Sequence, residues 1–224
     1  MTAAAGFFIV LEGPDKSGKS TQAEMLVRAL REHYERTGAD QKIVHTREPG
    51  GTSFAEAVRS VVLDPRHTVT PRAELLLYEA ARAQHTEQIL RPALADGCIV
   101  LSERYTLATL AYQGYARGLD LKLVREMNHV ATEGLQPDIT LLLDLPETHF
   151  EKRDPDRELD RLEKESISFR RKVRQGYQKL SETEPGIVRL DAQRKPHPIH
   201  VDLVSRVSVL LKETIEPLPL VAAP

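Results

Sequence analysis

Short apolar runs alternate along the chain with longer segments whose apolar residues recur every three or four positions. The runs lie at about residues 7–12, 42–46, 98–102, 139–144 and 186–190. Such runs are typical of strands that are buried in a parallel sheet. The segments between them have the period of an amphipathic helix. This alternation predicts an α/β fold.

Helix start and stop signals bound the intervening segments. Thr37-Gly38 closes the first helix, because glycine readily adopts the left-handed conformation that ends helices. Pro71 opens another, since proline is tolerated at the first helical position. The predicted helices cover 19–37, 53–63, 71–95, 106–117, 120–134 and 199–215. We expect a five-stranded parallel sheet with helices on both faces and right-handed crossovers.

The chain of 224 residues shows no internal repeat and no linker, so a single domain over 1–224 is expected. The segment 146–183 is strongly charged and breaks at Asp154-Pro155-Asp156. Pro217-Leu218-Pro219 begins a segment, 217–224, that we expect to be a frayed tail.

The charge balance argues against nucleic acid as a partner. The chain has 31 basic and 33 acidic residues, a net charge of −2 and no basic tract. Its single cysteine, Cys98, excludes an internal disulfide and a cysteine-based zinc cluster. Cys98 lies in an apolar run, which indicates a buried core thiol. The first residues do not resemble a signal peptide, and no run is long enough to span a membrane. We expect a soluble cytoplasmic protein.

The stretch between the first strand and the first helix reads G-x-x-x-x-G-K-S-T, the P-loop pattern. Gly13 and Gly18 allow successive backbone N–H groups to turn toward phosphate oxygens. Lys19 would reach the β- and γ-phosphates, and the Ser20 hydroxyl would hold Mg²⁺. A glycine-rich turn without a ligand is the alternative, but the flanking strand and helix argue against it. The residues expected to bind a nucleoside triphosphate are Gly13, Pro14, Asp15, Lys16, Ser17, Gly18, Lys19, Ser20 and Thr21.

Arginines and carboxylates recur where the predicted strands end. Arg47-Glu48 follows the second strand and Glu103-Arg104 follows the third. Ligands of such sheets bind beyond the carboxyl ends of the strands. A second anion beside a triphosphate needs arginines, and a metal-bridged phosphate needs a carboxylate. A lone arginine is more often a solvated surface charge. The recurrence of arginines and carboxylates at the strand ends instead indicates phosphoryl transfer to a phosphorylated acceptor.

These motifs resemble those of the thymidylate kinase family, whose members have a P-loop NTPase-type fold. The match runs from about residue 7 to residue 190. Besides the P-loop with Asp15, it rests on REPGGT at 47–52, RAELLLYEAAR at 72–82, ERY at 103–105, AYQG at 111–114, PDITLLLD at 137–144 and DRLE at 160–163. The resemblance implies transfer of the γ-phosphoryl group of ATP to dTMP, with Mg²⁺ as cofactor and a homodimer as the assembly.

The resemblance also implies roles for individual residues on the acceptor side. Asp15 would accept a hydrogen bond from the deoxyribose 3′-OH, and Arg104 would bind the acceptor phosphate. Tyr78 would stack on thymine, although a core aromatic in a leucine-rich helix is the alternative. The remaining substrate-binding residues implied are Glu48, Arg59, Arg82, Thr109 and Gln113.

On the catalytic side, Lys19 and Arg104 are expected to act together with a further cation. That cation is either Lys16 in the P-loop or Arg153 in a lid at about 150–163, which also carries Lys152, Arg157 and Arg161. A solvated loop lysine and a solvated lid helix are the alternatives for these positions. Ser20 and Glu103 are the expected metal ligands.

Three features depart from the family pattern. Lys16 places a cation in the P-loop although the lid is also basic, whereas family members tend to place the catalytic cation in one or the other. The other two departures are single positions. Glu103 stands where thymidylate kinases usually have aspartate, and Ala108 stands where many have serine. These departures leave two alternatives open. One is another P-loop kinase of nucleosides or nucleotides, such as a deoxynucleoside kinase. The other is a catalytically impaired nucleotide-binding relative. A GTPase is not expected, because the chain lacks an Asn-Lys-x-Asp motif.

Overall fold

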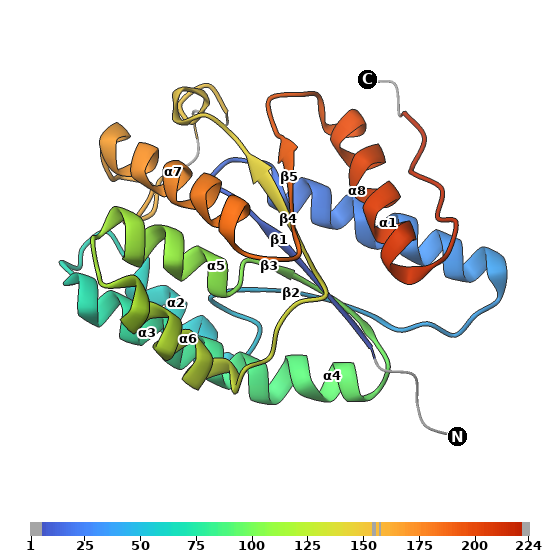
Figure 1. Cartoon of the computed structure of the whole chain (residues 1–224), viewed down its shortest axis with the longest axis horizontal. Coiled ribbons are helices and arrows are strands. Elements are labelled where there is room, and N and C mark those ends of the chain that lie inside the picture. Colours follow the sequence, from blue (N-terminus) through green and yellow to red (C-terminus); the bar gives the residue numbers. More distant parts are fainter. Residues whose placement is uncertain (1–5, 154–155, 157, 221–224) are drawn as a thin grey trace.

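In the computed structural model, which describes residues 6–153, 156 and 158–220, a parallel sheet forms the middle layer (Figure 1). Its strands lie in the order β2-β3-β1-β4-β5. The predicted α/β class with a five-stranded parallel sheet is confirmed, and each strand starts and ends within one residue of its predicted position. The strands are β1 (Phe7–Glu12), β2 (Ile43–Arg47), β3 (Ile99–Glu103), β4 (Ile139–Asp144) and β5 (Ile187–Asp191).

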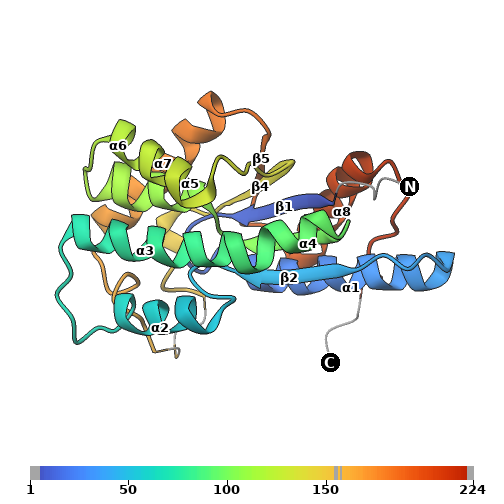
Figure 2. The same cartoon turned by 90° about the horizontal axis from the view of Figure 1, so that it is seen from below.

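Helices cover both faces of the sheet (Figures 1 and 2). Side chains alternate along β1, so that Ile9 and Leu11 pack against α1 and α8, while Phe8 and Val10 face the opposite layer. The helical segments are α1 (Lys19–Thr37), α2 (Ser53–Val62), α3 (Pro71–His85), η1 (Thr86–Leu90), α4 (Arg91–Ala95), α5 (Thr106–Thr109), η2 (Leu110–Ala116), α6 (Leu121–Thr132), η3 (Glu147–His149), α7 (Ile167–Thr183) and α8 (Pro196–Leu211). α3, η1 and α4 follow one another without a break over the predicted helix 71–95 (Figure 2).

Two helices differ from the sequence-based expectation. The last helix begins at Pro196 rather than at 199 and ends at Leu211, where Lys212 takes a left-handed φ of 58°. The charged segment before β5 contains α7, which the sequence pattern did not predict. Ser166 caps α7 by accepting a hydrogen bond from the Phe169 backbone N–H at 3.2 Å.

Leu218, within the expected frayed tail, is instead packed against α8, which corrects that prediction at this residue. Leu218 is 7% exposed, and its backbone N–H donates to His200 Nε2 at 3.0 Å. Burial lowers the pKa of His200 to about 4, so its ring is neutral at pH 7 and can accept this bond. Residues 221–224 lie outside the described residues.

Cys98 is buried, as predicted. Among the described helices, none has the length and apolar character that a membrane span needs.

Candidate active site

A cavity of about 890 Å³ opens where the parallel strands reach their carboxyl ends. Its walls come from the loop after β1, the ends of β2 and β3, helices α2 and α3, segment η2 and the predicted lid. Every residue predicted for the site lines this cavity except Gly13 and Pro14. Pro14 borders a small adjoining hollow beside Phe150 instead. The fold thus brings together residues that are up to about 140 positions apart in the sequence.

The loop between β1 and α1 has the backbone that its glycines permit. Gly13 and Gly18 have φ values of 142° and 94°, and a Cβ on Gly13 would lie 2.5 Å from the Leu143 carbonyl oxygen. Lys19 Nζ donates to the carbonyls of Gly13 at 3.0 Å and Pro14 at 2.8 Å. Burial, followed by the charge of Arg104, lowers the pKa of Lys19 to about 7. A bound anion would restore its charge.

A carboxylate from β3 lies directly against the first turn of α1. Ser20 Oγ donates to Glu103 Oε2 at 2.6 Å, and His45 Nε2 lies 3.1 Å from Glu103 Oε1. Burial alone would raise the pKa of Glu103, but the hydrogen bonds from His45 and Ser20 outweigh it, and the pKa is lowered. The longer side chain of Glu103 therefore still presents an ionised carboxylate beside Ser20.

These two oxygens suit Mg²⁺, which is usually held by one or two protein groups together with waters and substrate phosphates. Within the described ranges, no group of three or more His, Cys, Asp or Glu side chains could form an all-protein metal cage. Ser20 and Glu103 thus fit a metal ion that binds together with the nucleotide, because the phosphates would supply further ligands.

Arg104, at the end of β3, is held across the mouth of the P-loop. Its Nη2 forms an ion pair with Asp15, and its Nη1 donates to the Gly13 carbonyl at 3.0 Å. Tyr112 OH donates to the other carboxylate oxygen of Asp15 at 2.8 Å. The residues expected at the acceptor phosphate and at the sugar are therefore in direct contact in the structure.

Two further arginines, Arg47 and Arg59, line the same cavity. Arg59 is half-buried and donates to the Pro49 carbonyl at 3.0 Å. Burial, together with the positive charges of Arg47 and Arg104, lowers the pKa of Arg59. Arg47 pairs with Glu56 at 3.1 Å and Arg104 with Asp15. The charge of Glu56 offsets the lowering of the Arg59 pKa only in part. The net lowering of the Arg59 pKa means that the surroundings of this guanidinium favour an added anion.

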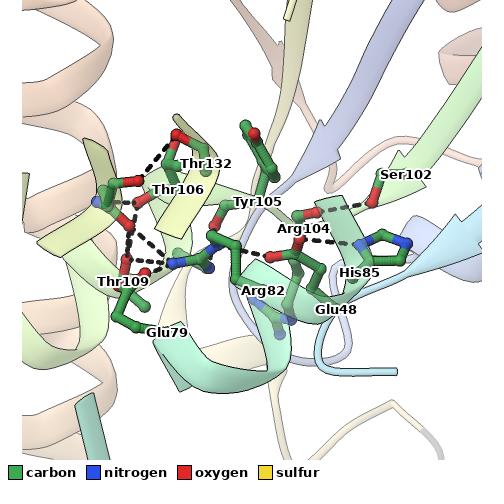
Figure 3. Close-up of polar contacts among 12 residues, drawn as sticks. Glu48, Glu79, Arg82, His85, Ser102, Arg104, Tyr105, Thr106, Thr109 and Thr132 are labelled. Carbon is green, nitrogen blue, oxygen red and sulfur yellow. Dashed lines mark hydrogen bonds and ion pairs between the residues drawn. The ribbon is translucent and has the colours of Figure 1, made fainter. Parts of the chain in front are cut away.

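Arg82 lies at the centre of a buried polar network (Figure 3). Its side chain is 2% exposed. Its guanidinium donates to Glu48 Oε2 (2.8 Å), Glu79 Oε1 (2.9 Å), Thr109 Oγ1 (3.1 Å), Asn128 Oδ1 (2.7 Å) and the Tyr105 carbonyl (3.0 Å). Burial would lower the pKa of Arg82, but the charges of Glu79 and Glu48 outweigh it and raise it. The Arg82 guanidinium is therefore held in place at the cavity wall and is not a mobile cation.

Glu48 is fixed from its other side by a histidine that the sequence pattern did not single out. His85 Nδ1 lies 3.0 Å from Glu48 Oε1, and its Nε2 lies 2.7 Å from Thr46 Oγ1. The His85 side chain is fully buried on α3 (Figure 3). Glu48 is thus held between Arg82 and His85, in a chain of contacts that runs from Arg82 through Glu48 and His85 to Thr46.

The wall near α3 and η2 combines an aromatic ring with an oriented amide. Tyr78 is partly buried and lines the cavity. Gln113 Nε2 donates to Glu74 Oε1 at 2.8 Å, and Glu74 is also paired with Arg117 at 3.1 Å and Arg161 at 2.7 Å. With its nitrogen used in this way, the Gln113 amide has its carbonyl oxygen available as an acceptor.

The geometry agrees with comparisons to known proteins. A family model described as "Thymidylate kinase" matches residues 11–203. The chain belongs to the thymidylate kinase family.

Individual relatives cover most of the chain. It is 43% identical to a thymidylate kinase of Halothermothrix orenii, over 90% of this chain and 96% of that protein. It is 48% identical to one of Synechococcus sp. strain JA-3-3Ab, over 84% and 89% of the two chains. The crystal structure of thymidylate kinase from Ehrlichia chaffeensis superposes with a TM-score of 0.73 at 28% identity, covering 91% of this chain and 99% of that one.

The predicted lid segment contacts the P-loop through Arg153. Its Nη1 donates to the Lys16 carbonyl at 3.1 Å, and its Nη2 donates to the Ala192 carbonyl. Lys16 has a left-handed φ of 59°, and its Nζ lies 4.5 Å from the centre of the Phe150 ring. Both candidate catalytic cations thus line the cavity. Arg157 lies outside the described residues.

Two residues behind Arg104 were not predicted from the sequence. Glu12, the last residue of β1, is fully buried, and burial raises its pKa. Tyr177 on α7 is 1% exposed. A carboxylate that ends an apolar strand is a recognisable signal for Glu12. No local signal marks Tyr177, because its partners lie far away in the sequence.

Proposed function

We propose that the chain transfers the γ-phosphoryl group of ATP to dTMP, giving dTDP and ADP. One observation carries the proposal. A single cavity joins a P-loop to a group of arginines and to an aromatic ring beside an oriented amide. A donor triphosphate, an acceptor phosphate and a pyrimidine base therefore each meet suitable chemistry within one cavity.

On the donor side, backbone N–H groups of the P-loop and the N-terminus of α1 bind the phosphates of ATP. Gly18 precedes the helix, and no side chain caps its first turn. Lys19 leaves its present carbonyl partners and binds the β- and γ-phosphates. Ser20 and Glu103 would hold Mg²⁺, which when bound would supply positive charge beside the phosphates.

On the acceptor side, Arg104 and Arg59 bind the phosphate of dTMP, while Asp15 accepts the 3′-OH of its sugar. Tyr78 stacks on the base, which typically contributes about 1–3 kcal/mol. The polar groups that contact the thymine edge are Arg82, Thr109 and Gln113. The Gln113 carbonyl accepts from the imide N–H, and Glu48 acts indirectly by orienting Arg82.

Catalysis by these residues consists of positioning and charge stabilisation. Phosphoryl transfer passes through a loose transition state that requires little covalent help from the protein. The two binding regions hold the attacking oxygen of dTMP in line with the γ-phosphorus. Lys19 and Arg104 stabilise charge on the transferring group, assisted by Lys16 or Arg153. Arg153 connects the lid to the P-loop, and lid closure excludes the water that would compete as acceptor.

The same proposal includes a single domain, a cytoplasmic location and a homodimer. Support for the dimer comes from helices α3 and α6, which are neighbours in the fold (Figure 2). Both helices expose large apolar side chains. Leu76, Leu123 and Val130 are 50%, 37% and 71% exposed. A second copy of the chain would bury them. Sedimentation at several protein concentrations tests this, and a monomer at all of them would contradict it.

The activity is tested by measuring ADP release with Mg²⁺, ATP and one acceptor at a time. We expect dTMP to react fastest among dTMP, dUMP, the other deoxynucleoside monophosphates and thymidine. Lys19→Ala should abolish the reaction. Faster use of thymidine would favour the deoxynucleoside kinase alternative. No ADP above the Lys19→Ala control would identify a catalytically impaired relative.

A further inference from the structure

Helix α7 packs against η2 more closely than a residue with a side chain at Gly176 would allow. A Cβ on Gly176 would lie 2.8 Å from Tyr115 Cβ on η2, which is shorter than real contacts of this kind. Glycine at this position lets the two segments pack backbone against side chain. The next residue, Tyr177, is thereby placed between η2, β1 and the end of β3, and it does not line the cavity.

The hydroxyl of Tyr177 bridges two charged groups. It donates to Glu12 Oε2 at 2.8 Å and accepts from Arg104 Nη1 at 3.2 Å. Because a hydroxyl has one proton, donation to Glu12 turns its lone pairs toward the arginine. Tyr177 therefore contacts the phosphate-binding arginine from the side that faces away from the cavity.

Glu12 is itself held in place, so the direction of the Tyr177 hydroxyl is fixed. The other oxygen of Glu12 accepts from the backbone N–H groups of Tyr105 at 2.8 Å and Ala108 at 3.1 Å. These N–H groups belong to the start of α5, directly after Arg104. A buried carboxylate with its oxygens engaged in this way makes a rigid support.

Arg104 needs such support because its own backbone is strained. Its φ of 72° lies in the left-handed region, which costs a residue with a Cβ about 1–2 kcal/mol. Its backbone N–H donates to the Leu11 carbonyl at 2.8 Å. The direction of its guanidinium is set by contacts with Asp15 and the Gly13 carbonyl on one side and with the Tyr177 hydroxyl on the other.

We propose that Tyr177 is a positioning residue that holds Arg104 in the geometry required to bind the acceptor phosphate. The inference rests on the proposed function in one respect, the assignment of the acceptor phosphate to Arg104. It adds that α7, the helix following the lid segment, is coupled to the acceptor side of the site through one hydroxyl group.

The test is Tyr177→Phe, which removes the hydroxyl and keeps the buried ring. Affinities for dTMP and for thymidine are measured separately by calorimetry, together with kcat and the KM values for dTMP and ATP. We expect dTMP to bind about tenfold more weakly, since the lost hydrogen bond involves a charged group. Thymidine, which has no phosphate, should bind as before, and the KM for ATP should not change.

Tyr34→Phe is the matched control, because it removes another buried tyrosine hydroxyl far from the cavity. Tyr34 lies on α1 and is 6% exposed. Both variants should lose similar thermal stability, but Tyr34→Phe should leave the affinity for dTMP unchanged. In an Arg104→Ala background, Tyr177→Phe should have no further effect on dTMP, because the residue through which it acts is gone.

Three results would overturn the inference: unchanged dTMP affinity in Tyr177→Phe, equal weakening of dTMP and thymidine, or an additive effect in the Arg104→Ala background. Each would reduce Tyr177 to a packing residue while the wild-type enzyme still phosphorylates dTMP. Failure of the wild-type enzyme with dTMP would instead refute the proposed function.

Discussion

Replacing Arg82 by methionine should lower the free energy of unfolding by about 3–5 kcal/mol at neutral pH. The side chains of Arg82, Glu48 and Glu79 are only 2%, 4% and 4% exposed. Removing the cation would leave two carboxylates buried with no positive partner of comparable strength. The cost of an unpaired buried charge, rather than the lost attraction alone, sets this magnitude.

The difference in unfolding free energy between the wild-type chain and Arg82→Met should become smaller as the pH falls. In the wild-type chain, burial alone would raise the pKa of Glu48, but Arg82 and His85 outweigh it and lower the pKa. A depressed folded-state pKa contributes stability above the unfolded-state pKa, and this is lost as the pH falls through the folded value. In Arg82→Met, burial dominates and raises the pKa of Glu48 instead. It also raises the pKa of Glu79 further, since burial already holds that pKa above its ordinary value in the wild-type chain. The folded state of the variant then favours the protonated carboxyls. Acidification therefore reduces the stability that the variant has lost relative to the wild-type chain.

Urea unfolding followed by circular dichroism at about pH 7.5 and about pH 5.5 measures both effects. Arg28→Met is the matched control, since Arg28 pairs with Glu32 at 2.7 Å on the surface, with side chains 65% and 49% exposed. Loss of that pair should cost at most about 0.5 kcal/mol. If Arg82→Met were no more destabilising than Arg28→Met, the description of Arg82 as the centre of a buried network would be wrong.

Three further predictions concern the site itself. Tyr78→Ala should raise the KM for dTMP about tenfold or more with little effect on that for ATP, and equal increases would make Tyr78 a core residue only. Glu103→Gln should raise the Mg²⁺ concentration needed for half-maximal rate about tenfold, and an unchanged Mg²⁺ titration would remove Glu103 from the metal site. Lys19, with a pKa of about 7 in the free protein, should take up a proton when ATP binds. The affinity for ATP should therefore fall as the pH rises above about 7. Calorimetry in buffers of different ionisation enthalpy checks this, and the absence of proton uptake near pH 8 would contradict it.

The sequence predicted local features well because their signals are local. Helix α1 has its predicted bounds, since Gly18 and Gly38 both adopt left-handed φ values that only glycine takes readily. The strands of the sheet were predicted because a short apolar run between two helical segments is typical of a buried strand and too short for a further helix. The P-loop needed only its glycines, Lys19 and the neighbouring strand and helix.

Helix α7 was missed because charged residues conceal its apolar positions. Phe169, Val173, Tyr177 and Leu180 form its buried face, at a spacing that fits a helix. Arginines and lysines separate them, and the segment follows a break at a proline, so the charge dominated the pattern. The start of α8 was placed too late because Pro196 stands at its first position, where proline is tolerated but is also a breaker elsewhere.

The site was predictable as a set of residues but not as a set of contacts. Nearly all the predicted residues line one cavity. Their partners come from distant parts of the chain, as when Asn128 of α6 completes the network of Arg82, and spacing in the sequence cannot show such pairs. Their individual roles remain predictions.

The most direct test of the central proposal is the rate of ADP formation from ATP and Mg²⁺ across nucleoside monophosphates and thymidine. We predict the highest kcat/KM for dTMP, with dTDP formed in equal amount to ADP, and no reaction with Lys19→Ala. A higher kcat/KM for thymidine, or ADP formation that does not depend on any added acceptor, would contradict the account.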